Sequence, residues 1–189
     1  MSSHPVVSIA TVSLNSVAHI EETIKSVIIQ SYQYIEYLVI DGGSTDGTLS
    51  LIQDYAEYIH QFTSAPDRGI YDAMNKALYR CKGKWILFLN AGDILAHNST
   101  IDSLVAIAKI NPDSIIYGDT EVLSHRGGRI ARKGRNINSL WQGSAFCHQS
   151  CLIPVSYHLK NLYDLNFQIA ADYNFFWQAY CNNISFIYL

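Results

Sequence analysis

The first 117 residues alternate between segments typical of buried strands and segments typical of amphipathic helices. Strands are predicted at residues 6–12, 34–40, 59–64, 84–89 and 114–117. Helices are predicted between them, at residues 18–30, 48–58, 70–81 and 99–110. Strands that are joined by helices pair in parallel and bury both faces of their sheet. The order therefore predicts an α/β fold, with a mostly parallel central sheet and helices on both faces.

The second half of the chain has a different pattern. Residues 125–135 hold three glycines and five of the 13 Lys and Arg residues, which predicts an exposed hairpin or loop. A strand at 149–153, an aromatic helix at 171–180 and a strand at 184–188 follow. We expect one domain over 1–189. Because the sequence stops inside an apparent strand, we also expect a further C-terminal segment.

Local details of the first two helices are also predicted. Asn15 or Ser16 has the side chain to cap the first helix. In the second helix, Leu49, Ile52 and Ala56 have the spacing of an inward face. The four cysteines, Cys81, Cys147, Cys151 and Cys181, match neither a zinc ribbon nor a redox Cys-x-x-Cys and are interpreted as reduced, buried thiols. Metal ligation by Cys147-His148-x-x-Cys151 is a weaker alternative.

Charge and hydropathy limit the partners of the chain. A net charge of -3 gives no overall attraction to nucleic acid, so no nucleic-acid partner is expected. The longest apolar run, Trp85 to Leu89, is far shorter than the ~20 residues of a membrane helix. Met1 to Pro5 is short and polar, and no signal peptide is predicted. We expect a cytoplasmic protein, with peripheral association at the inner face of the cytoplasmic membrane as an alternative.

Acidic side chains follow three successive strands at the point where each predicted strand ends. Asp41 follows the second strand, Asp67 the third and Asp93 the fourth. In open parallel sheets, ligands bind beyond the carboxyl ends of the strands. We therefore expect the three carboxylates to lie on one edge of the sheet and to line one ligand site.

The chemistry of these segments suits a nucleotide. Asp41 can accept hydrogen bonds from a base or a ribose, and the glycines after it let a ligand approach the backbone. Arg68 or Lys76 could meet a diphosphate, and Asp93 could bind Mg²⁺ or Mn²⁺. The alternative is structural: tight turns, helix caps and surface charges. Tyr71 and Asn75, one helical turn apart, share a face.

Taken together, these segments resemble the family 2 glycosyltransferases, which have the GT-A fold. The resemblance lies in Val7 to Thr11 with Asn15, Val39 to Thr48, Asp67 to Lys76, and Phe88 to Asp93. It covers most of the chain and is strongest up to about residue 95. The segment from Asp67 to Lys76 is similar to the bacterial branch that builds surface polysaccharides.

The resemblance implies a role for each matching residue. Residues 1–97 would form a nucleotide-binding half and residues 98–189 an acceptor-side half. Asp172 would be the catalytic base and Asp93 the ligand of a divalent cation, Mg²⁺ or Mn²⁺. The nucleotide would be bound by Asn15, Asp41, Asp67 and Arg68. Donor and acceptor would be bound by Tyr71, Asn75, Lys76, His148 and Trp141, although His148 could be structural and Trp141 a core or lid residue.

The implied reaction is an inverting transfer of a hexose or N-acetylhexosamine. The donor would be a nucleotide-diphospho-sugar, with UDP-sugars ahead of GDP-sugars, and the acceptor a polysaccharide or a lipid-linked saccharide. The basic cluster from Arg126 to Arg135 could hold a lipid-linked diphosphate acceptor near an anionic membrane, or could be a solvated loop. Neither a dehydrogenase Gly-x-Gly-x-x-Gly nor a hydrolase Gly-x-Ser-x-Gly segment occurs at the required place.

The sequence departs from the family pattern at three places. Asn90 and Gly92 stand where the family usually has carboxylates near Asp93. Ala171 replaces a Glu before the base, and Gly42 replaces a second acidic residue after Asp41. These departures leave a second hypothesis open, in which the chain is a non-catalytic nucleotide-sugar-binding or scaffold domain.

Overall fold

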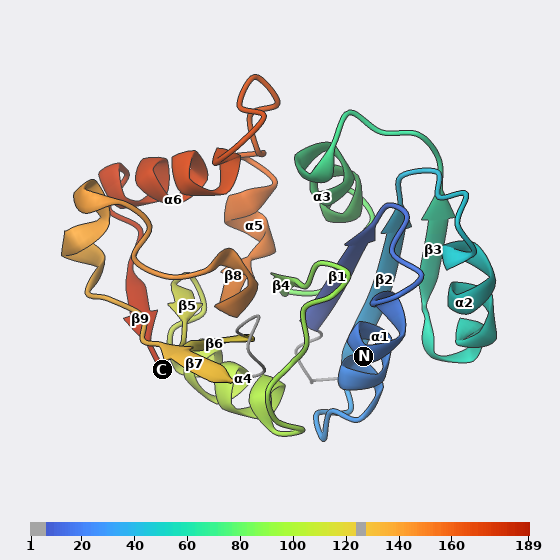
Figure 1. Cartoon of the computed structure of the whole chain (residues 1–189). Coiled ribbons are helices and arrows are strands. Elements are labelled where there is room, and N and C mark those ends of the chain that lie inside the picture. The colour runs from blue at the N-terminus through green and yellow to red at the C-terminus, as the bar shows by residue number, and fades with distance from the viewer. Residues whose placement is uncertain (1–6, 124–127) are drawn as a thin grey trace.

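Seven strands form one central sheet in the order β3-β2-β1-β4-β8-β5-β9 (Figure 1). The computed structural model describes residues 7–123 and 128–189. The strands are β1 Val7–Ser13, β2 Ile35–Asp41, β3 Gln61–Ser64, β4 Trp85–Phe88, β5 Ile115–Tyr117, β8 Cys151–Pro154 and β9 Phe186–Tyr188. Strands β1 to β4 are parallel, β9 is parallel to β5, and β8 is antiparallel to both β4 and β5. The predicted mostly parallel sheet is confirmed.

Helices cover both faces of this sheet, as predicted. One face carries α1 Ile20–Ile28, α2 Thr48–Asp54 and α4 Thr100–Ile110, and the other carries α3 Ile70–Leu78 and α6 Ala171–Cys181. The alternation along β1 explains how both faces are filled. Val7 and Ile9 pack into the core under α1 and α4, whereas Ala10 and Val12 pack into the core under α3 and α6.

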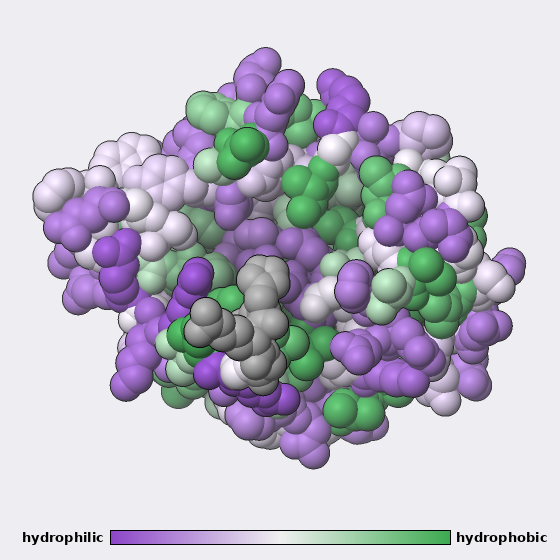
Figure 2. All heavy atoms as spheres, viewed as in Figure 1, coloured by the Kyte–Doolittle hydropathy of each residue, from purple (hydrophilic) through white to green (hydrophobic). Residues whose placement is uncertain are grey.

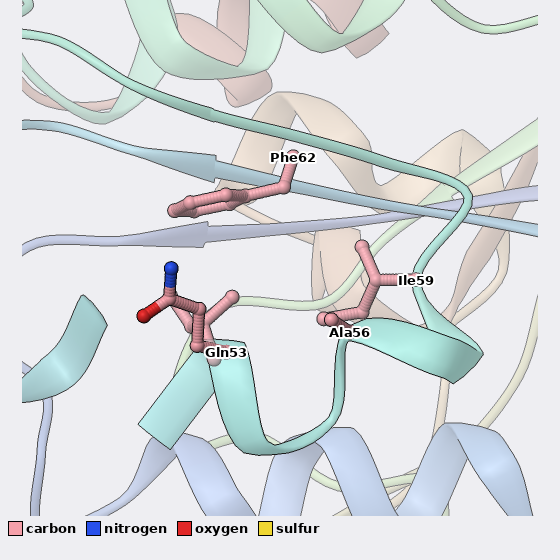
Figure 3. A pocket seen from close by; sticks show the side chains of 5 residues that line it. Gln53, Ala56, Ile59 and Phe62 are labelled. Carbon is pink, nitrogen blue, oxygen red and sulfur yellow. The ribbon is translucent and has the colours of Figure 1, made fainter. Parts of the chain in front are cut away.

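Several short elements were not predicted. They are the helix α5 Val155–His158 and the 3-10 turns η1 Ala56–Tyr58, η2 Ile137–Gln142 and η3 His148–Ser150. The predicted second helix is interrupted, because α2 ends at Asp54 and η1 follows it. Ala56 is therefore exposed, and its predicted inward position is wrong. It lines a surface pocket with Ile52, Gln53, Ile59 and Phe62, none of which is an expected site residue (Figure 3).

The predicted capping of the first helix is also wrong. Helix α1 begins after His19, and no side chain caps it by a hydrogen bond. The Asn15 side chain instead accepts a hydrogen bond from the backbone N–H of Thr45, and the Ser16 hydroxyl donates to the carbonyl of Leu14. Asn15 thus joins the loop after β1 to the loop after β2.

The basic segment of the second half forms part of a separate hairpin. A hairpin was one of the two forms predicted for this segment, the other being a loop. Strands β6 Thr120–Leu123 and β7 Arg129–Arg132 pair antiparallel, outside the central sheet. Every residue of β7 is exposed. His125 and Arg126, like Met1 to Pro5, lie outside the described residues. Among the residues that are described, no helix has the length and apolarity needed to span a membrane.

An aromatic cluster joins β4 to the second half of the chain. The His158 ring stacks on Phe175 with centroids 4.2 Å apart and meets the edges of Phe88 and Tyr163. His158 is completely buried, and this burial lowers its pKa to about 4. Because the folded protein holds this imidazole neutral, stability depends on pH.

We expect acid to destabilise the fold through His158. The folded-state pKa of about 4 lies below the usual 6.5, so only the unfolded chain gains this proton as the pH falls below about 6.5. From about pH 7.5 to about pH 5, the lost free energy of unfolding should be about 2 kcal/mol. Urea unfolding of the wild type and His158→Phe at both pH values measures it. Equal pH dependence in the two proteins would contradict this account.

Candidate active site

The carboxylate of Asp41 ties three neighbouring strand ends together. It is 1% exposed and accepts hydrogen bonds from the hydroxyls of Ser13 at the end of β1 (3.0 Å), Ser64 at the end of β3 (2.7 Å) and Ser44. The backbone N–H groups of Gly43 and Ser44 donate to it as well, at 2.9 and 2.8 Å. Since a carboxylate has about four lone-pair sites, these five donors saturate it.

Two opposing effects set the charge of Asp41. Burial acts to raise its pKa, but the hydrogen bonds from Ser44, Ser64 and Ser13 outweigh burial and hold the pKa below its usual value. The carboxylate is thus ionised at neutral pH with its oxygens already occupied. In this arrangement Asp41 shapes the loop at the strand ends.

Asp67 lies directly beside the loop that Asp41 shapes. A Cβ atom on Gly42 would stand 2.8 Å from the Oδ2 atom of Asp67, so the Asp67 carboxylate lies against this glycine. The other oxygen of Asp67 accepts a hydrogen bond from the N–H of Gly69 at 2.9 Å. The contact between Gly42 and Asp67 joins the loop after β2 to the loop after β3.

The loops after β1, β2 and β3 therefore meet at one edge of the sheet. Asn15 joins this edge through its backbone N–H, which donates to the Ser44 hydroxyl at 2.7 Å. Arg68 and Lys76 lie close by, on either side of the Asp72 carboxylate, at 3.4 and 3.3 Å. The structure thus brings Asn15, Asp41, Asp67, Arg68 and Lys76 together.

Asp172 reaches the same region from the first turn of α6. The Tyr71 hydroxyl on α3 donates to its Oδ1 atom at 2.8 Å, and the Nδ1 atom of His148 lies 3.0 Å from Oδ2. Burial acts to raise the pKa of Asp172, but the hydrogen bonds from His148 and Tyr71 lower it below the usual value. Burial and this hydrogen bond raise the pKa of Tyr71 to about 12. Asp172 is therefore an ionised carboxylate facing α3 and η3.

The direction of β8 explains how His148 arrives there. Because β8 is antiparallel to β4, it begins at the edge of the sheet where β4 ends. The turn η3, which immediately precedes β8, therefore lies beside the loop that carries Asp93. The Gln149 side chain donates to Asp93 at 3.1 Å, while the amide of Asn90 lies 3.4 Å from the Nε2 atom of His148.

Asp93 and Asn90 provide oxygen atoms suited to a hard cation. Burial raises the pKa of Asp93, and the Oδ1 atom of Asn90 is buried with no hydrogen-bond partner among the described residues. Mg²⁺ and Mn²⁺ take oxygen ligands, and Mg²⁺ usually keeps waters and binds substrate phosphates. In the described part of the chain, no three His, Cys, Asp or Glu side chains gather as a metal site, so the Cys147-His148-x-x-Cys151 alternative is wrong. Of the four cysteines only Cys151 is buried and Cys181 is exposed, so the predicted burial of all four is wrong as well. The residues fit a cation that substrate phosphates would help to hold.

Asn75 and Trp141, both expected to bind donor or acceptor, differ in how their side chains are engaged. Both polar atoms of the Asn75 side chain bond to the backbone of Tyr163, at 2.9 and 3.0 Å. Asn75 therefore anchors the second half of the chain on α3. Trp141 is 68% exposed on η2. Its neighbour Leu140 accepts a hydrogen bond from Tyr173 on α6, which fixes η2 against α6.

Several residues of the site were not predicted from the sequence. Ser13 lies directly after the predicted strand 6–12, Ser64 ends the predicted strand 59–64, and Gln149 lies beside the expected His148. Position in the predicted sheet was the available signal for the serines, because both strands end at the predicted binding edge. Figure 2 shows hydrophilic side chains gathered in the hollow between the α3 and α6 sides of the molecule.

Comparison with known proteins identifies relatives of the chain. The family model for glycosyl transferase family 2 matches residues 8–166. A PGL/p-HBAD biosynthesis glycosyltransferase of Mycobacterium bovis (strain BCG / Pasteur 1173P2) is 30% identical over 189 residues, 94% of this chain and 71% of the relative. TuaG of Bacillus subtilis, named for teichuronic acid biosynthesis, is 39% identical over 92 residues, 47% of this chain and 36% of TuaG.

Solved structures share the fold at lower identity. S. aureus TarS in complex with UDP-GlcNAc has a TM-score of 0.80 and 19% identity, covering 97% of this chain and 56% of that one. The mannosyltransferase PcManGT of Pyrobaculum calidifontis, in complex with GDP-Man and Mn²⁺, has a TM-score of 0.77 and 17% identity, covering 100% and 55%. This chain thus spans little more than half of either structure. The chain belongs to glycosyl transferase family 2: it is a glycosyltransferase with the GT-A fold.

Proposed function

We propose that this chain catalyses an inverting transfer of a sugar from a nucleotide-diphospho-sugar to a saccharide acceptor. The observation that carries the proposal is the position of Asp172. Its ionised carboxylate is fixed by Tyr71 and His148, and His148 also lies within 3.4 Å of the loop residue Asn90. A carboxylate that can accept a proton thus stands beside the loop of Asp93, where a cation and a diphosphate would be held.

The donor site that we propose lies over the ends of β1 to β4. Asp41 shapes the nucleoside loop, and Asp67 offers an oxygen beside Gly42 to a base N–H or a ribose hydroxyl. Arg68 and Lys76 stand near the same edge as cations for the diphosphate. A UDP-sugar, with N-acetylglucosamine or another hexose, is supported by the UDP-GlcNAc complex of TarS. The GDP-Man complex of PcManGT makes a GDP-sugar the second candidate.

The proposed chemistry is one in-line displacement. The acceptor hydroxyl oxygen forms a bond to the anomeric carbon while the bond from that carbon to the diphosphate oxygen breaks. Asp172 takes the hydroxyl proton, and the electron pair of the broken bond leaves with the nucleoside diphosphate. A divalent cation held by Asp93 and Asn90 would supply charge stabilisation for that leaving group. A single displacement on the face opposite the leaving group inverts the anomeric centre.

Asp93 gives a test of the donor site. We expect UDP binding to depend on Mn²⁺ in the wild type, because a cation links the diphosphate to this carboxylate. Asp93→Ala should weaken Mn²⁺-dependent UDP binding by at least about tenfold, corresponding to about 1.4 kcal/mol. Titration calorimetry with UDP, and with GDP for comparison, measures this. Absence of binding by either nucleotide to the wild type would remove the proposed function.

Asp172 gives a test of the chemical step. Asp172→Asn keeps the shape of the side chain but removes its ability to take a proton, so kcat for transfer should fall by about 10²- to 10⁴-fold. The UDP affinity should change by less than about threefold, since Asp172 does not belong to the proposed donor site. Turnover by mass spectrometry and calorimetry check both values. Unchanged turnover would exclude Asp172 as the base, and donor binding without transfer or hydrolysis in the wild type would favour the non-catalytic alternative.

The β6–β7 hairpin supports a proposal about the acceptor side. Arg129 and Arg132 are exposed on β7, with Lys133 following, while Leu123 and Ile130 are 70% and 55% exposed. Basic side chains with exposed apolar neighbours suit an anionic membrane surface. We propose that this hairpin holds the enzyme peripherally at the inner face of the membrane, where lipid-linked acceptors are presented.

Membrane association through the hairpin can be measured directly. Replacing Arg129, Arg132 and Lys133 by Gln should lower binding to vesicles rich in phosphatidylserine by at least about tenfold. A cation contributes about 1 kcal/mol near such a surface, and Arg129 contributes less because Glu121 lies 3.3 Å from it. The matched control replaces three exposed lysines elsewhere, Lys82, Lys109 and Lys160, by Gln. Sedimentation with vesicles gives the comparison. An equal loss of vesicle binding in both variants, or no vesicle binding by the wild type, would rule out a specific role of the hairpin.

A further inference from the structure

Two adjacent side chains of η3 hold the two carboxylates on which the proposed reaction depends. His148 contacts Asp172 at 3.0 Å, and Gln149 donates to Asp93 at 3.1 Å. The carboxylates lie 79 positions apart in sequence (172 minus 93) and belong to different structural units: the loop after β4 and the first turn of α6. The η3 turn is therefore a direct hydrogen-bonded link between them.

The η3 turn is itself firmly placed. The backbone N–H of Ser150 donates to the carbonyl of Cys147, and the Ser150 hydroxyl donates to the same carbonyl at 2.9 Å. Cys151, which follows, is completely buried and begins β8 in the central sheet. The two side chains thus project from a backbone segment that the start of β8 holds in place.

His148 itself has one proton-donating nitrogen directed at Asp172. The amide of Asn90 faces Nε2 as a donor, which leaves Nδ1 as the protonated nitrogen toward Asp172. The side chain of Asp172 is 23% exposed and that of His148 only 12%, so Asp172 is the more accessible of the two to an acceptor hydroxyl. This geometry makes Asp172 the proton acceptor and His148 the group that orients it.

We propose that His148 and Gln149 are paired positioning residues, which set the base carboxylate and the cation-binding carboxylate relative to each other. This inference rests on the proposed function of the same site. During transfer, the acceptor oxygen must line up with the bond that breaks on the opposite side of the anomeric carbon. A rigid η3 turn between Asp172 and Asp93 fixes the side of attack relative to the side of departure.

Two substitutions of His148 separate positioning from packing. Asn places an amide N–H near the position of Nδ1, so His148→Asn can still donate to Asp172. Gln places its amide near the position of Nε2, so His148→Gln cannot, although it fills more of the space. We expect His148→Gln to lower kcat for transfer by at least about tenfold with donor KM within about threefold. His148→Asn should retain kcat within about threefold of the wild type.

Gln149 is tested by its own variant, with a separate measurement. Gln149→Met keeps the length of the side chain but removes the donor to Asp93, so the Mn²⁺ concentration for half-maximal turnover should rise by about threefold or more. His148→Gln should leave that concentration unchanged within about twofold. Ser156→Ala changes an exposed residue of α5 and controls for differences between protein preparations. It should match the wild type in kcat and in the Mn²⁺ concentration for half-maximal turnover.

A measurement without turnover distinguishes this inference from the proposed function. Nitrogen-15 NMR of the imidazole should find the proton of neutral His148 on Nδ1 in the wild type, and a larger share on Nε2 in Asp172→Ala. A proton on Nε2 in the wild type would overturn the inference, as would loss of kcat in His148→Asn equal to that in His148→Gln. A wild type with the Nδ1 tautomer but no nucleotide-sugar turnover would contradict the proposed function and, with it, the positioning role.

Discussion

The hydrogen bonds around Asp41 fix the edge on which the whole site depends. One ionised, buried carboxylate holds the ends of β1 and β3 through Ser13 and Ser64, and orders its own loop through Ser44. A buried carboxylate is costly unless donors surround it, so the serines at these strand ends form a set with it. Because the three ends are fixed, Asn15 and Asp67 reach the same place from separate loops.

The antiparallel strand β8 adds the second half of the site to this edge. Had β8 run parallel to β4, the η3 turn before it would have stood at the opposite end of the sheet. Its actual direction places His148 and Gln149 between the loop of Asp93 and the first turn of α6. The two hydrogen bonds between the Asn75 side chain and the backbone of Tyr163 then hold that half against α3. A two-sided site is thus built from segments far apart in the chain.

Much of the fold and part of the site could be predicted, for identifiable reasons. The strand and helix periods were strong in the first 117 residues, and the polar residues at the strand ends indicated the binding edge. Local hydrogen bonds were harder to predict. Asn15 has the right chemistry for a helix cap, but its side chain accepts a hydrogen bond from a loop 30 residues away instead. The partners of Asp41 and Asp93 depend on register and on the direction of β8, which no local pattern encodes.

A crystal structure with UDP and Mn²⁺ bound tests the central claim, that one edge of the sheet unites the carboxylates around a sugar nucleotide. The uracil and ribose should lie against the loop of Gly42 to Ser44 beside Asp67, and the metal should contact Asp93. The terminal phosphate should then face Asp172 across the hollow between the α3 and α6 sides. Nucleotide bound elsewhere, or a metal that does not contact Asp93, would contradict the account.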